Sequence, residues 1–179
     1  KIFHVFDSEG TLKRSFGEPI KPPEEEGLES FHDLRVVGIK CCIARDNSIY
    51  HSNPYEYTIS RYSREGKLMA KIDRVAPFYF PSRLVRKEYP HGLSITVASS
   101  PIPLSILAAE DAKVLSFIRY AEGEKMIWAI DIFDSVGNFL ISHIGKHKGF
   151  GRCIDKRNRI YVISSDPFPI VLRYAISFD

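Results

Sequence analysis

Three cysteines and a pair of histidines are the residues of this chain whose types could bind a metal ion or carry redox chemistry. Cys41 and Cys42 are adjacent, and His143 and His147 stand four residues apart in the stretch HIGKHKG. Zinc sites need three or four converging ligands, and no CxxC or HExxH motif accompanies these residues. Cys42 and Cys153 occupy the same position of a repeated segment at which small apolar residues pack. We therefore interpret both as buried structural cysteines that do not pair with each other.

Four acidic residues could suggest a carboxylate constellation for acid–base catalysis, but each falls in a turn. They are Asp7, Asp46, Asp111 and Asp134. Turn residues recur in a repeated chain because every hairpin needs its turn, so repetition favours a structural role. The sequence also lacks a GxSxG elbow, a glycine-rich phosphate loop and a kinase signature. It therefore indicates no catalytic residue.

The stretch FYFPSRLVRKEYPHG, residues 78–92, combines cationic and aromatic side chains. Such a segment could contact a partner protein, a glycan or a nucleic acid. Alternatively, it is a solvated loop whose aromatic residues cover the edge of a sheet. The sequence leaves both interpretations open.

The elements that position the residues discussed above include one hairpin motif, which occurs three times. Phe-Asp-Ser-x-Gly ends at Gly10 and again at Gly137, and RYSREG is a related copy that ends at Gly66. Asp or Ser at the first turn position accepts backbone hydrogen bonds, and Gly at the fourth takes a positive φ without steric cost. The spacing predicts turns at Asp7–Gly10, Ser63–Gly66 and Asp134–Gly137.

A second motif precedes those hairpins. CIARDNSIY (42–50) and CIDKRNRIY (153–161) align at a constant offset of 111, and LAAEDAKVL (107–115) is a weaker copy at offset 65. Each copy reads as an inner strand, a polar turn and a second strand.

The alternating motifs predict a four-stranded antiparallel meander that is used several times. Such sheets cannot bury both faces alone, so they must stack or close into a ring. We predict an all-β fold, a β-propeller with about three and a half blades in a single domain, the alternative being a β-sandwich with accidental turn similarity. The predicted blade segments are residues 1–17, 36–72, 104–145 and 149–179. Lys21–Ser30 and Val75–Pro103 are predicted connections between blades, and part of the second could instead form the approach of an inner strand.

The motifs resemble those of NHL-repeat and related six-bladed β-propellers. Arg159-Ile160-Tyr161-Val162 is similar to the end of one blade strand in that family. Ile2–Gly17 resembles the strand and turn that follow it in a blade of that family. The resemblance implies a non-catalytic binding or scaffold module that uses loops on one face. It also implies an alternative, a lactonase-like hydrolase that holds calcium in its central channel. Asn47 and Asn158 are candidate calcium ligands by residue type.

In a propeller meander, the loops between the second and third strands lie at the same end as the connections between blades. Unrepeated aromatic and cationic residues at this end form the predicted partner site. They are His51, Tyr55, Arg83, Arg86, Lys87, His91, His147, Lys148 and Phe168. The expected partner is a protein or a polar or anionic ligand.

Charge and hydrophobicity bear on the kind of partner and on whether the chain crosses a membrane. The net charge of +3 arises from 25 basic and 22 acidic residues, which leaves nucleic acid open as a partner without arguing for it. No apolar run approaches about 18 residues, and KIFHVFDSEG lacks the layout of a signal peptide, so we expect a soluble domain. We also expect both ends of the chain to fall in strands whose missing neighbours come from further sequence or from another chain.

Overall fold

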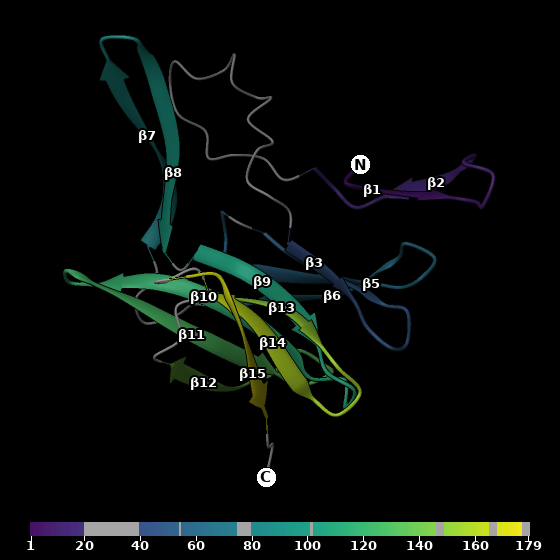
Figure 1. Ribbon diagram of the computed structural model, residues 1–179. Coiled ribbons are helices and arrows are strands. Elements are labelled where there is room, and N and C mark those ends of the chain that lie inside the picture. Colours follow the sequence, from purple (N-terminus) through teal and green to yellow (C-terminus); the bar gives the residue numbers. More distant parts are fainter. Residues whose placement is uncertain are drawn as a thin grey trace.

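The structure is a computed structural model that describes residues 1–19, 40–53, 55–74, 80–100, 102–145, 149–164 and 168–176. Fifteen strands and no helix make up this described part, so the all-β prediction is confirmed. Figure 1 shows the strands as separate sheets beside one another, with one long hairpin that rises away from them. No helix long and apolar enough to cross a membrane occurs in the described ranges.

The strands form five sheets, each built from consecutive strands. The N-terminal hairpin comprises β1 (Phe3–Phe6) and β2 (Leu12–Phe16). The first sheet comprises β3 (Lys40–Ile43), β4 (Ile49–Ser52), β5 (Thr58–Tyr62) and β6 (Leu68–Asp73). The arm comprises β7 (Phe80–Tyr89) and β8 (Gly92–Ser100). The second sheet comprises β9 (Ile102–Ala108), β10 (Val114–Glu122), β11 (Lys125–Phe133) and β12 (Phe139–Gly145). The third sheet comprises β13 (Phe150–Ile154), β14 (Arg159–Ser164) and β15 (Ile170–Ala175).

All neighbouring strands are antiparallel and follow chain order, which is the predicted meander. The first and second sheets have four strands, and the third has three among the described residues. Within the described ranges, none of the sheets closes on itself.

The predicted turns have a common geometry. The Asp7 N–H donates to the Thr11 carbonyl at 3.0 Å, and the Gly10 N–H donates to the Asp7 carbonyl at 3.1 Å. The same pair of bonds recurs around Ser63 and Asp134 and in the hairpins that join the first two strands of each larger sheet. It is a type I turn followed by a residue with positive φ, a common connection in three-residue hairpin loops. The three predicted turns are therefore confirmed.

The second sheet is buried on both faces because it lies between the first and third sheets. One core cluster joins it to the first sheet, through residues such as Tyr57, Ile59 and Phe133. The other joins it to the third sheet, through residues such as Leu115 and Ile160. Side chains alternate along a strand, so β10 can be buried almost throughout only when both of its faces are covered.

The N-terminal hairpin packs on the opposite face of the first sheet through aromatic rings. The ring centroids of Phe3 and Phe16 lie 6.0 and 5.6 Å, respectively, from the ring centroid of Tyr62. Arg14 donates to the carbonyl of Arg64 in the neighbouring turn.

Two predictions need correction. Part of the predicted connection Val75–Pro103 forms the arm, because strand-favouring residues flank a two-residue turn at Pro90-His91. Its proline at position 81 falls at a register irregularity between Phe80 and Arg83, where strands tolerate proline. The other predicted connection, Lys21–Ser30, lies outside the described residues.

The cysteine prediction is wrong for Cys153. All three cysteines are free, as predicted for the pair, but Cys153 is exposed and Cys42 is half-buried. Cys42 opposes Tyr50 on the face that the second sheet covers, and this burial raises its pKa to about 12. Cys153 opposes Tyr161 at the equivalent position of the third sheet, and no described sheet covers that face.

Candidate binding surface

Four of the predicted site residues lie along the arm. Arg83, Arg86 and Lys87 belong to β7, and His91 lies in the turn. Between Phe80 and Ser100 the chain carries these three basic residues and a single acidic residue, Glu88. The arm is thus a short ribbon with a positive balance of charge, which favours anionic partners.

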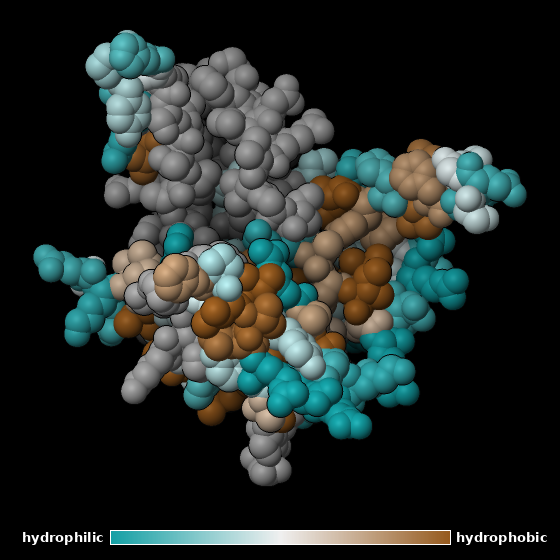
Figure 2. Space-filling view, in the orientation of Figure 1, coloured by the Kyte–Doolittle hydropathy of each residue, from teal (hydrophilic) through white to brown (hydrophobic). Residues whose placement is uncertain are grey.

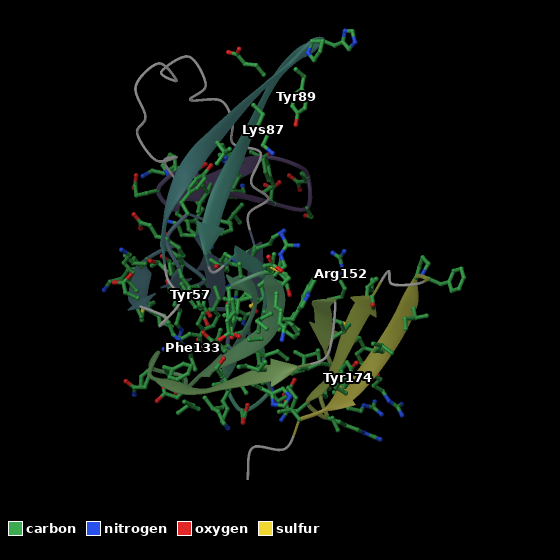
Figure 3. The ribbon with its side chains drawn as sticks, turned by 90° about the vertical axis from the view of Figure 1, so that its left-hand side faces the viewer. Tyr57, Lys87, Tyr89, Phe133, Arg152 and Tyr174 are labelled. Atoms are coloured by element: carbon green, nitrogen blue, oxygen red, sulfur yellow. The ribbon has the colours of Figure 1, made fainter. Side chains whose placement is uncertain are left out.

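The far end of the arm is exposed. Lys87 and His91 are exposed, and the side chain of Tyr89 is 56% exposed. Figure 3 places Lys87 and Tyr89 on the arm, well away from Tyr57 and Phe133 among the sheets. Figure 2 shows hydrophilic residues gathered at the same end. A tyrosine beside cationic side chains can stack on a partner and donate a hydrogen bond to it.

Two other predicted site residues lie inside the protein. His51 on β4 is only 4% exposed and meets the Phe3 ring edge-on at 5.7 Å between centroids. Burial lowers the pKa of His51 to about 4, so it is neutral at physiological pH. Tyr55 is 7% exposed, and burial raises its pKa. In this conformation neither residue is available to a partner at the surface.

The remaining predicted residues are not joined to the arm. Phe168, which precedes β15, is 73% exposed and belongs to the connection into the last strand of the third sheet. His147 and Lys148 lie outside the described residues.

The two candidate calcium ligands have a structural function in turns. Asn47 and Asn158 have φ values of 63° and 54°, and Ala112 has 63° at the equivalent position of the second sheet. Asparagine adopts this left-handed conformation more readily than most residues. The Asn158 side-chain oxygen also accepts a hydrogen bond from the backbone N–H of Glu110 at 3.2 Å. No group of three or more His, Cys, Asp or Glu side chains suited to a metal ion is found in the described part of the chain.

A buried charged network, which the sequence interpretation missed, joins the first and second sheets. Asp131 on β11 is fully buried, and one of its carboxylate oxygens accepts hydrogen bonds from Tyr57 Oη at 2.8 Å and Arg74 Nε at 2.9 Å. The Arg74 guanidinium lies over the Phe139 ring, 3.4 Å from its centroid. Burial, together with the Asp131 charge, raises the pKa of Tyr57 well above its ordinary value.

This network is built to fix two sheets against each other. The Asp131 charge is matched by Arg74 and enclosed between β-sheets, so the carboxylate has no access to a substrate in this conformation. A sequence signal did exist: Asp131 is an acidic residue in the otherwise apolar run MIWAIDIF, residues 126–133. A charge at a core-facing position of a strand indicates a buried partner.

Neither the protein-family models nor the curated proteins compared with this chain give a match.

Proposed function

We propose that this chain is a non-catalytic binding module of the β-propeller type, whose arm binds an anionic partner protein. In this proposal the first, second and third sheets are consecutive blades, and the N-terminal hairpin supplies the two outer strands of the preceding blade.

The packing of equivalent positions supports the blade assignment. The inner strands β3 and β9 contact each other, as do β9 and β13, so the innermost strands of successive sheets are neighbours. The pair Cys42 and Tyr50 faces the second sheet, and the equivalent pair Leu107 and Leu115 faces the third. Each sheet therefore uses the same register position to contact the next sheet, as radially arranged blades do.

The arm is the observation that carries the binding function. A two-stranded ribbon is only marginally stable in water by itself, and the strand edges that it exposes are templates for other chains. The arm contacts the sheets through β8 and β10 and otherwise extends away from them in Figure 1. A projecting ribbon with Arg83, Arg86 and Lys87 on one strand has the positive charge that an acidic protein segment requires, and Lys87 is exposed.

Charge removal on the arm tests the proposal. A variant that combines Arg83→Ala, Arg86→Ala and Lys87→Ala should bind a fluorescein-labelled polyglutamate peptide roughly tenfold or more weakly than the unchanged chain at low salt. The readout is fluorescence anisotropy at two salt concentrations, because screening weakens charge-dependent binding. The control removes the same number of positive charges, three, from the body of the protein, with Arg64→Ala, Lys67→Ala and Lys71→Ala.

Equal losses in the two variants would show that net charge, and not the arm, binds the peptide. A single-stranded DNA oligonucleotide that binds the unchanged chain more tightly than polyglutamate at the same salt would favour a nucleic-acid partner instead.

A further inference from the structure

An apolar groove lies between the second and third sheets, apart from the arm. Its cavity volume is about 310 Å³, and β10, β11 and β12 form one side while β14 and β15 form the other. Trp128, Ile130, Ile141, His143 and Tyr174 are among the lining residues.

The groove lies beside the open edge of the third sheet. β15 pairs with β14, and no described strand occupies its other edge. In the first and second sheets the equivalent third strands, β5 and β11, each pair with a fourth strand. Backbone donors and acceptors along Ile170–Ala175 are thus arranged for one more antiparallel partner.

In the two complete sheets, the turn before the fourth strand makes the same kind of contact with the preceding sheet or hairpin. A Cβ at Gly66 would lie 2.6 Å from the Phe16 ring, and a Cβ at Gly137 would lie 2.6 Å from Ile72 Cγ1. In both cases the turn glycine that precedes a fourth strand rests on the outermost strand of the sheet before it. Phe16 and Ile72 each follow the turn glycine of their own hairpin by six residues.

His143 occupies this same position in the second sheet, six residues after Gly137, and it is exposed in the groove. From this equivalence we infer that the groove receives one β-strand, preceded by an Asp-x-x-Gly turn. The strand pairs antiparallel with β15, its turn glycine rests on His143, and its apolar side chains cover Ile141 and Trp128.

The occupant is a strand with the chain's own repeat pattern, because the two complete sheets place such a strand at this position. The N-terminal hairpin of a second copy carries the same turn, but its Phe3 and Phe16 already pack on Tyr62 of its own first sheet. An extended strand would form backbone hydrogen bonds with the open edge of β15 and also cover the apolar side chains that line the groove. A small apolar ligand would only cover the side chains. This inference is independent of the proposed function of the arm.

A peptide with the sequence of residues 134–145, DSVGNFLISHIG, is the probe. It lacks tryptophan, and Trp128, the only tryptophan of the chain, lines the groove. Titration of the peptide should change the fluorescence of Trp128 in a saturable way. Bound peptide should also slow hydrogen–deuterium exchange of the β15 amides.

Two substitutions on β12 provide a matched comparison. Ile141 is 58% exposed and lines the groove, whereas Ile144 is 62% exposed and does not line it. Ile141→Arg should weaken peptide binding tenfold or more, and Ile144→Arg should leave it unchanged. Should Ile141→Arg fail to fold, a peptide with prolines in place of its Leu and second Ser, which cannot complete the strand ladder, replaces it as the test.

Absence of saturable binding, or equal binding of the proline-containing peptide, would overturn the inference. So would dimerisation of the chain alone that Ile141→Arg abolishes, since a second copy would then occupy the groove. Binding of an apolar dye at Trp128 that the peptide does not displace would likewise assign the groove to a small ligand.

Discussion

Ala112 is the clearest example of a residue whose conformation is set by the repeat and not by its own preference. Its φ of 63° matches those of Asn47 and Asn158, and it stands at the equivalent turn position. An alanine in the left-handed region costs roughly 1–2 kcal/mol, whereas glycine adopts it without a Cβ clash.

Ala112→Gly should therefore stabilise the protein by about 0.5–1 kcal/mol, because Ala112 is exposed and loses no packing. The measurement is the free energy of unfolding from urea denaturation. The reverse control, Asn47→Ala, should destabilise by a similar amount. A loss of stability in Ala112→Gly would contradict the assigned turn geometry.

His51 should make the protein sensitive to acid. Its folded-state pKa of about 4 lies below the 6.5 of the unfolded chain, so protons bind preferentially to the unfolded state. Stability should be unaffected above pH 6.5 and should fall as the pH drops from about 6.5 to about 4. The loss attributable to His51 reaches at most about 3.5 kcal/mol, because each pKa unit corresponds to about 1.4 kcal/mol.

His51→Phe should flatten this part of the stability profile, measured by denaturant titration at several pH values between 4 and 7. The control is His4→Gln, at an exposed histidine whose removal should leave the acid sensitivity in place. An unchanged slope in His51→Phe would mean that other groups cause the acid sensitivity.

At the scale of elements, the turns before β6 and β12 do two things: they reverse the chain, and their glycines, Gly66 and Gly137, pack on the outermost strand of the sheet before them. Gly10 and Gly66 have nearly the same φ, 82° and 86°, but a Cβ at Gly10 meets nothing within 4 Å while one at Gly66 meets Phe16. The two glycines therefore separate the cost of the turn conformation from the cost of the contact between sheets.

Gly10→Ala should cost about 1–2 kcal/mol from the positive φ alone. Gly66→Ala should cost an additional 1–3 kcal/mol, because the new methyl group displaces the Phe16 ring. Thermal and urea denaturation of both variants measure the difference. Equal losses would show that the turn does not dock on the N-terminal hairpin.

At the scale of the whole molecule, the second sheet is the central layer of the described chain. Leu115 and Ile118 on β10 are fully buried on opposite faces, one in each core cluster. Val171 on β15 of the third sheet is 67% exposed.

Leu115→Ala and Ile118→Ala should each cost about 2–5 kcal/mol, because both remove methyl groups from a close-packed interface between sheets. Val171→Ala should cost less than about 0.5 kcal/mol. Free energies of unfolding from urea titrations test this order. A small effect of one β10 variant would mean that the corresponding neighbour sheet does not cover that face in solution.

The sequence by itself determined the repeated hairpins, their turns and the order in which their strands pair, but not the two strands of the arm. These are local properties: an Asp or Ser at the start of a turn and a residue able to take positive φ at its fourth position act within a few residues, and a short turn pairs consecutive strands. The repeat alignment also placed Ala112 at the turn position of Asn47 and Asn158, although alanine rarely adopts the left-handed conformation found there.

Only the tertiary structure decided which faces are covered. Cys42 and Cys153 have the same sequence context and the same cross-strand partner type, yet a neighbouring sheet covers only Cys42. His51 was predicted at a binding surface because its position in the chain is near a loop, but Phe3, far away in sequence, packs against it. The pairing of Asp131 with Tyr57 and Arg74 likewise joins residues from two sheets. Burial depends on which sheet lies against which, and residues distant in the sequence determine that arrangement.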